Sequence, residues 1–169
     1  ISGTGGIAQN GTGRTTLTGA STYAGLTTVN AGTLQFASVA ALSNPANLTV
    51  NAGATAAFNV GGSGEFTAGD ITALSSLGTV TTGFTNGSFL GFDTTNAAGG
   101  VFTYNGNLTD LNAGANALGL AKLGTGTLEL GGVNTYSGDT LVQTGTLRLG
   151  SSTALSANTT LNVSAGATF

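Results

Sequence analysis

The chain has 169 residues, of which 30 are Gly and none is Cys, His, Met or Trp. Three basic residues against six acidic ones give a net charge of −3, too few cations for a phosphate-binding stripe, so we expect no nucleic-acid partner. The lack of Cys excludes disulfides and thiolate zinc sites, and no apolar run approaches the ~18 residues of a membrane-spanning helix.

A long internal repeat organises the sequence. Residues 11–56 align with residues 124–169 without a gap, at an offset of 113, and 23 of the 46 aligned positions are identical. A shorter period of 21 runs inside each copy, because VNAGTL begins at Val29 and VNAGAT at Val50. Units of about 20 residues that hold two or three short strands are typical of the coils of a β-solenoid.

The first repeat copy, residues 6–56, predicts short strands with one apolar face. In TLQF (33–36) the Leu and the Phe point inward and Gln35 points outward, and LTV (48–50) alternates in the same way. Each strand is too short to be stable alone and buries its apolar face only where coils stack. Positive φ or a close approach of the backbone is expected at the glycines between strands, which are residues 25, 32 and 53, matched by 138, 145 and 166.

The middle of the chain, residues 57–123, is less regular. It holds six of the eight Phe, which predicts stacked rings in the core, and VFTYN (101–105) shows strand alternation. We expect about three coils here, with longer excursions near 72–78 and 93–100. A helix is not expected, and ITALSSL (71–77) is the one segment with room for a turn of helix.

The second repeat copy, residues 124–169, restores the pattern. In TLEL (127–130) and TLRL (146–149) the two Leu of each segment point inward, whereas Glu129 and Arg148 point outward. The whole chain, 1–169, is therefore predicted to be one all-β segment, a β-solenoid of about seven or eight coils of 21–23 residues.

Residues 124–147 resemble a known family. Their pattern is similar to the autotransporter-associated β-strand repeat, also called the passenger-associated transport repeat, which runs roughly G-x-G-T-L-x-L-x-G-x-N-T-Y-x-G-x-T-x-V-x-x-G-T-L. The matching positions are Gly124, Gly126, Leu128, Leu130, Gly132, Asn134, Thr135, Tyr136, Gly138, Thr140, Val142, Gly145, Thr146 and Leu147. The resemblance implies a right-handed parallel β-helix in a large bacterial surface or secreted protein, and no catalytic residues to carry over.

One stretch, NTYSGDTLVQTGTLRLG (134–150), brings Tyr136, Asp139 and Arg148 together in the sequence as a possible acid, cation and phenol. The first copy has Leu26 in place of Asp139 and Gln35 in place of Arg148, so the polar positions vary while the apolar and Gly positions persist. This is the pattern of a scaffold. We expect no catalytic, cofactor-binding or metal-binding residues and no enzyme activity.

Two further classes of residue are candidate sites. Tyr23 and Tyr136 persist in both copies, and each ring is expected to pack over a coil corner with its hydroxyl bonded to a backbone group; the alternative is an exposed ring that stacks on a glycan. The carboxylates are scattered and carry no calcium signature, namely Glu65, Asp70, Asp93, Asp110, Glu129 and Asp139.

The predicted function is structural. We expect a module of a bacterial extracellular or cell-surface fibre, stalk or autotransporter-like passenger, from a mature or partial chain, that stacks end to end with copies of itself or with neighbouring repeats. The alternative is an adhesin that binds surface glycans. A third reading, a polysaccharide-acting β-helix enzyme, needs clustered acids and a base on one face.

Overall fold

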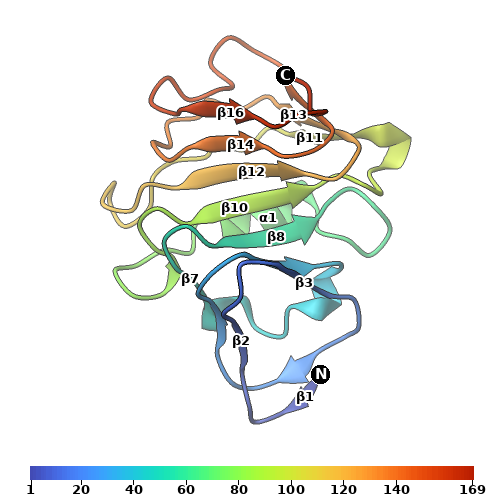
Figure 1. The fold of residues 1–169 in the computed structure, drawn as a ribbon, viewed down its shortest axis with the longest axis vertical. Coiled ribbons are helices and arrows are strands. Elements are labelled where there is room, and N and C mark those ends of the chain that lie inside the picture. Colours follow the sequence, from blue (N-terminus) through green and yellow to red (C-terminus); the bar gives the residue numbers. More distant parts are fainter.

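The computed structural model describes residues 1–169 as a parallel β-solenoid. The chain climbs coil by coil from the N-terminus at one end to the C-terminus at the other (Figure 1), and all pairs among its sixteen strands are parallel. This confirms the predicted fold class. No helix is long and apolar enough to span a membrane.

The strands of successive coils stack into four parallel sheets. The seven-stranded sheet holds β3 (Arg14–Leu17), β6 (Thr33–Phe36), β8 (Thr55–Asn59), β10 (Phe89–Asp93), β12 (Gly119–Leu123), β14 (Thr140–Val142) and β16 (Leu161–Val163). The four-stranded sheet holds β2 (Ile7–Gln9), β5 (Thr27–Val29), β7 (Leu48–Val50) and β9 (Gly83–Phe84). The three-stranded sheet holds β11 (Val101–Tyr104), β13 (Thr127–Leu130) and β15 (Thr146–Leu149), and β1 (Ser2–Gly3) pairs with β4 (Thr22–Tyr23).

The coils differ in length. Partners in the seven-stranded sheet lie 19 to 22 residues apart near the ends, as for Thr33 and Thr55, but 34 apart between Thr55 and Phe89 and 30 apart between Phe89 and Gly119. The irregular middle therefore makes two long coils, where the sequence predicted about three coils with longer excursions near 72–78 and 93–100. Excursions outside the strands account for the extra residues.

One of these excursions is a helix, α1 (Ala68–Leu74), which the sequence did not predict. Thr67 caps it and forms a reciprocal capping box with Asp70, and Ile71 and Leu74 bury their side chains against the core. The capping box satisfies free N–H groups of the first turn, which lets so short a helix form. Three 3₁₀ turns complete the irregular segments, at Val39–Ala41, Pro45–Asn47 and Ala98–Gly100.

The core follows the predicted alternation. Leu34 and Phe36 are fully buried inside the solenoid, and the ring of Phe36 stacks on that of Phe58 in the next coil with centroids 5.5 Å apart. Phe66 packs edge-on against Phe58. Phenylalanines stacked along the axis thus fill the middle of one continuous cluster of 30 buried residues, as the sequence indicated.

The two repeat copies lie on different faces of the solenoid. In the first copy β5 and β7 belong to the four-stranded sheet, whereas their sequence equivalents β14 and β16 belong to the seven-stranded one. Likewise β3 and β6 lie in the seven-stranded sheet and their equivalents β13 and β15 in the three-stranded sheet. The 113-residue offset therefore spans four coils and one further face, so each strand of the second copy lies one face further around the solenoid than its equivalent in the first copy.

The glycines expected at coil corners act in the two ways predicted. Gly32 and Gly145 have φ of 62° and 68°, and a side chain on either would collide with carbonyl oxygens of the preceding coil. Gly53 and Gly166 have φ of 75° and 82° but face open space. Equivalent glycines thus carry equivalent constraints, although they lie on different faces.

Candidate functional site

The residues that the sequence brought together do not form a site. Tyr136 is fully buried, Asp139 is exposed, and Arg148 forms an ion pair with Glu129 on the neighbouring strand. Arg148 and Glu129 point outward, as the alternation predicted. A surface pair of this kind contributes little to stability.

The two tyrosines that occur at the same position of both repeat copies lie at coil corners. Tyr23 and Tyr136 are 3% and 0% exposed, and their hydroxyls bond the side chains of Thr27 at 2.5 Å and Thr140 at 2.7 Å. The partner is thus a Thr hydroxyl and not the expected backbone group, and the reading of exposed glycan-stacking rings is wrong. Burial raises the pKa of Tyr136, against the opposing effect of its hydrogen bonds to Thr140 and Thr159.

Five of the six carboxylates are tied into local structure. Asp70 caps α1, Glu129 pairs with Arg148, and Asp110 accepts hydrogen bonds from Leu118 and Ser137 that join one coil to the next. The remaining two of the five, Glu65 and Asp93, are 8% and 4% exposed. No group of three or more acidic side chains is gathered where it could hold a metal ion.

Glu65 and Asp93 belong to a buried polar cluster that also contains Gln35 and Asn59. Gln35 Nε2 donates to Asn59 Oδ1 at 2.6 Å and to Asp93 Oδ2 at 2.9 Å. Asn59 in turn donates to Glu65 at 3.5 Å. The members come from three consecutive coils, β6, β8 and β10, so the cluster fastens these coils together on the outer side of the seven-stranded sheet.

The outer side of this sheet is concave. Gln35 reaches Asp93 across two coil spacings, and Arg14 on β3 lies 3.9 Å from the same carboxylate across three. Stacked strands are about 4.8 Å apart, and the long Gln and Arg side chains span these distances along the hollowed outer side of the sheet. Both oxygens of Asp93 are engaged, since Thr95 donates to Oδ1 from its N–H and its hydroxyl.

The buried polar cluster leaves one atom without a partner. Gln35 Oε1 is the only buried side-chain N or O atom with no hydrogen bond. The orientation of the amide is fixed, because both Nε2 contacts are to acceptor oxygens, one of them on a carboxylate. An unpaired buried acceptor costs about 1–3 kcal/mol, so this atom is a site where an added donor stabilises the structure.

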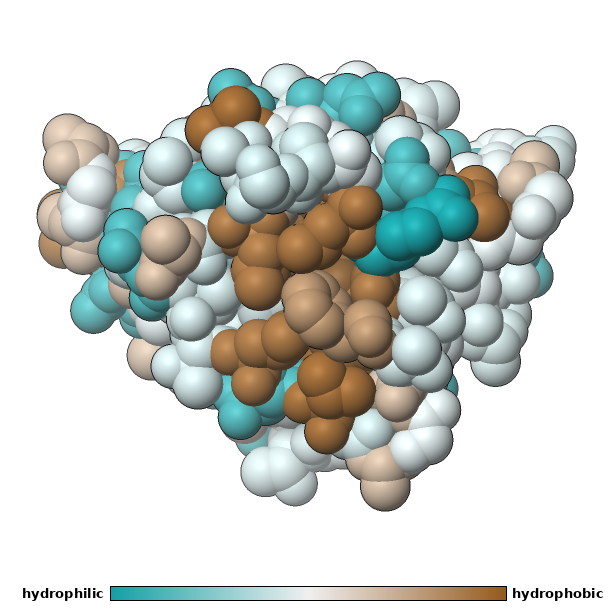
Figure 2. Space-filling view, turned by 90° about the horizontal axis from the view of Figure 1, so that it is seen from above, coloured by the Kyte–Doolittle hydropathy of each residue, from teal (hydrophilic) through white to brown (hydrophobic).

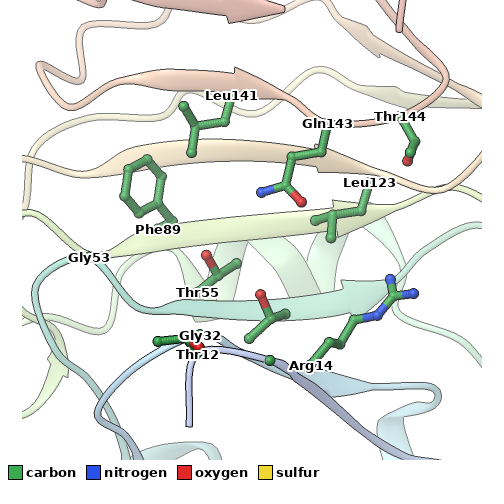
Figure 3. A pocket seen from close by; sticks show the side chains of 12 residues that line it. Thr12, Arg14, Gly32, Gly53, Thr55, Phe89, Leu123, Leu141, Gln143 and Thr144 are labelled. Carbon is green, nitrogen blue, oxygen red and sulfur yellow. The ribbon is translucent and has the colours of Figure 1, made fainter. Parts of the chain in front are cut away.

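A groove of about 480 Å³ lies on the same concave side. We call it the outer groove. Side chains from successive strands project into it from one side of the sheet (Figure 3), and it is lined by Thr12, Gly13, Arg14, Gly32, Thr33, Gly53, Thr55, Phe89, Leu123, Leu141, Gln143 and Thr144. It runs along the solenoid axis from β3 to β14, across both repeat copies.

Small residues hollow out the sheet beside the groove. Ala57, Gly91 and Ala121 are aligned partners on three neighbouring strands, all pointing outward, and all are buried. Phe89 is the one outward-facing Phe of the central strands; it is half-buried, and its ring lies across Gly119, where any side chain would collide with it. The ring of Phe89 is therefore held in place by small residues of the sheet beneath it.

Lys122 is a buried cation on the inner side of the same sheet. Its ammonium donates to the carbonyls of Leu123 at 2.7 Å, Gly124 at 2.8 Å and Thr144 at 3.1 Å, and so joins two coils at a corner. Burial lowers its pKa from 10.5 to about 8, while the charge of Asp93 acts to raise it. Its bonds go to main-chain oxygens, so its place is structural.

Sequence reasoning found neither the buried polar cluster nor the outer groove. It placed Gln35 outward, which is correct, but outward here means buried in a concavity and not solvated. Its partners lie 24 and 58 residues away, and the coil that carries Asp93 has no counterpart in the first repeat copy. A regular 21-residue spacing could not have aligned them, since the coil between Asn59 and Asp93 is 34 residues long.

The fold and these features define a β-solenoid repeat module. Its coils stack in parallel, glycines lie at the coil corners, and the hydroxyls of two buried tyrosines bond threonine side chains. Comparison with known families agrees. A family model described as the passenger-associated transport repeat matches residues 7–36 and 120–149. The resemblance expected from the sequence is thereby confirmed, and it agrees with the predicted extracellular or cell-surface location.

A match to one named protein agrees with the family comparison. The chain is similar to the adhesin BmaC autotransporter of Brucella suis biovar 1 (strain 1330), with 45% identity over 75 residues. This match covers 44% of the chain but only 2% of the length of that adhesin. No solved structure matches the chain significantly.

Proposed function

We propose that this chain is a non-enzymatic structural segment of a bacterial surface passenger, one part of a longer solenoid array, which stacks end to end on coils of its own kind. The stacking partner is either the neighbouring repeats of the same chain or a second copy. The main support for the proposal is that both ends of the solenoid have unpaired strand edges and that one end exposes core residues.

The end near the C-terminus exposes its core. Figure 2 looks onto this end and shows hydrophobic residues gathered at its centre inside a paler, more polar rim. Val163 on β16 continues the inward row of Val142, yet it is 43% exposed, and Phe169 is 52% exposed. One hydrogen-bonding edge of β16 is unpaired, because β14 is its only neighbour. An apolar end with free backbone groups favours another strand layer on top of it.

The other end is open in the same sense. β3 has only β6 as a neighbour, and three of its four residues are exposed. A ladder of asparagine amides also runs to this end, since Asn51 donates to Asn30 at 2.7 Å and Asn30 donates to Asn10 at 2.7 Å. A further coil with an amide or hydroxyl oxygen at this corner would extend the ladder from Asn10.

The repeat itself specifies how one copy would sit on another. Stacking that keeps equivalent strands together places β2 of the next copy over β16, because β2, β5 and β7 are the equivalents of β12, β14 and β16. β2 lies in the four-stranded sheet and β16 in the seven-stranded one. Each copy would therefore be turned by one face, a third of a revolution, relative to the last.

Stacking can be tested by changing the end without changing the fold. Val163→Asp places a carboxylate in the exposed apolar end, whereas Asn162→Asp adds the same charge one residue away on the outward face of β16. We expect concentration-dependent rods of the wild type and of Asn162→Asp in sedimentation velocity and negative-stain images, and monomers of Val163→Asp. A monomeric wild type at every concentration, or assembly of Val163→Asp equal to the wild type, would refute stacking on a second copy.

A further inference from the structure

We propose that the outer groove is a binding site for a linear, neutral glycan. This inference concerns the side of the solenoid and stands independently of stacking at its ends. It rests on the shape of the groove, its aromatic surface, its polar groups and its charge.

The groove has the dimensions of a chain and not of a single sugar. It is lined by residues from β3 to β14, which are five strand spacings apart in the seven-stranded sheet. At about 4.8 Å per spacing this is roughly 24 Å, measured along the axis. The lining of the groove includes Arg14, which lies 3.9 Å from Asp93.

Phe89 supplies the apolar contact that a sugar ring needs. Its ring is half-buried, lies across Gly119 and packs beside Ala57, Ala121 and Leu123, so it is fixed before any ligand arrives. An aromatic ring that is already held in place loses little conformational freedom when a ligand binds. The aliphatic C–H face of a pyranose is the complementary surface.

The remaining lining supplies hydrogen bonds without charge. Hydroxyls of Thr12, Thr33, Thr55 and Thr144 and the amide of Gln143 both donate and accept, as sugar hydroxyls do. Arg14 is the only charged residue among the twelve that line the groove. A neutral polyhydroxylated ligand therefore matches it better than a polyanion or a polycation.

The buried polar cluster adjoins the groove. Gln35 lies on β6, the strand of the lining residue Thr33, and beside β8, which carries the lining residue Thr55; its Oε1 has no hydrogen bond and is buried. Arg14, which lines the groove, sits 3.9 Å from Asp93 of the same cluster and keeps about half of its side chain exposed. Arg14 therefore links the wall of the groove to the buried polar cluster.

Two other occupants fit less well. An extended peptide that adds to a sheet needs a free strand edge, whereas the groove lies on the face of a sheet in which every lining strand except the end strand β3 is paired on both sides. A nucleic acid needs several cations along its phosphates, and the groove offers one.

The test is a titration of the full 169-residue chain with linear neutral oligosaccharides of about five residues, α- and β-linked glucans, mannans and galactans, at millimolar concentration, read by ¹⁵N chemical shifts. We expect at least one of them to shift the amides of Thr55, Phe89 and Gln143 and to leave Asn30 on the opposite sheet unchanged. No shift with any of them, shifts confined to residues outside the groove, or binding of an extended peptide there instead would overturn the proposal.

Variants separate the groove from the fold and from stacking. Phe89→Ala should weaken binding roughly tenfold, the loss of one aromatic contact, and Gln143→Ala, which is exposed and carries no packing, by severalfold. Val163→Asp should bind as the wild type does, because Val163 lies at the end and not in the groove. Equal affinity of Phe89→Ala and Gln143→Ala with the wild type would contradict the assignment even where the chain binds a glycan.

Discussion

The stability of the solenoid should rise with pH because of Lys122. The pKa of this buried ammonium is about 8 in the folded chain, against the 10.5 expected once it is unfolded. Below pH 8 both states hold the proton, and the buried charge destabilises the fold. Between pH 8 and 10.5 the folded state gives up its proton first, so unfolding takes up a proton and the free energy of unfolding increases with pH.

The size of the effect follows from the pKa difference. Each pH unit inside the window adds about 1.4 kcal/mol, so we expect a gain of about 2–3 kcal/mol between pH 8 and pH 10. At about 2–4 °C per kcal/mol for a chain of this length, the melting temperature should rise by several degrees. Above pH 10 the raised pKa of Tyr136 acts in the opposite direction, because the unfolded phenol ionises more readily than the buried one.

Urea denaturation followed by circular dichroism at pH 7, 8, 9 and 10 measures this directly. Lys122→Met should remove the rise, whereas Arg148→Met, which removes an exposed cation, should keep it. A wild-type stability that stays flat or falls between pH 8 and 10 would refute the reasoning. It would mean that the carbonyls of Leu123, Gly124 and Thr144 hold the proton more strongly than burial expels it.

Three further predictions concern stability in the same assay. Gly145→Ala should cost about 3 kcal/mol or more, from positive φ and collision with two carbonyls, but Gly166→Ala only about 1 kcal/mol, because it meets nothing; equal costs would contradict the corner assignment. Tyr136→Phe should cost about 1 kcal/mol through loss of the bond to Thr140, and a neutral result would show that the hydroxyl is dispensable. Thr67→Ala should cost about 1 kcal/mol by removing the cap of α1, and it should lower helical signal without dissociating the sheets.

The features that the sequence predicted are those that depend only on residues close together in the chain. Alternation in residues 33–36 puts Leu34 and Phe36 inside, and the corner glycines recur because the backbone of one coil approaches the next at the same points. The same local rules hold for both copies. Burial and backbone geometry near a residue therefore followed from its few neighbours in the sequence.

The features that the sequence did not predict depend on coil length. The helix α1 lengthens one coil to 34 residues, and its signal was a single Thr67–Asp70 capping box in a Gly-rich stretch. Once that length is known, Gln35 comes to lie beside Asp93 and the second copy turns by one face; without it, neither contact nor rotation can be derived. The outer groove follows from the same register and was out of reach for the same reason.

The most direct measurement of end-to-end stacking is the helical symmetry of assembled particles by electron cryomicroscopy. Seven coils at about 4.8 Å give a rise of roughly 34 Å per copy, and the placement of β2 over β16 gives a rotation of one third of a turn. Rods with this rise and rotation are the expected result. Particles in which copies associate side by side, or stack with their seven-stranded sheets aligned and no rotation, would contradict the account.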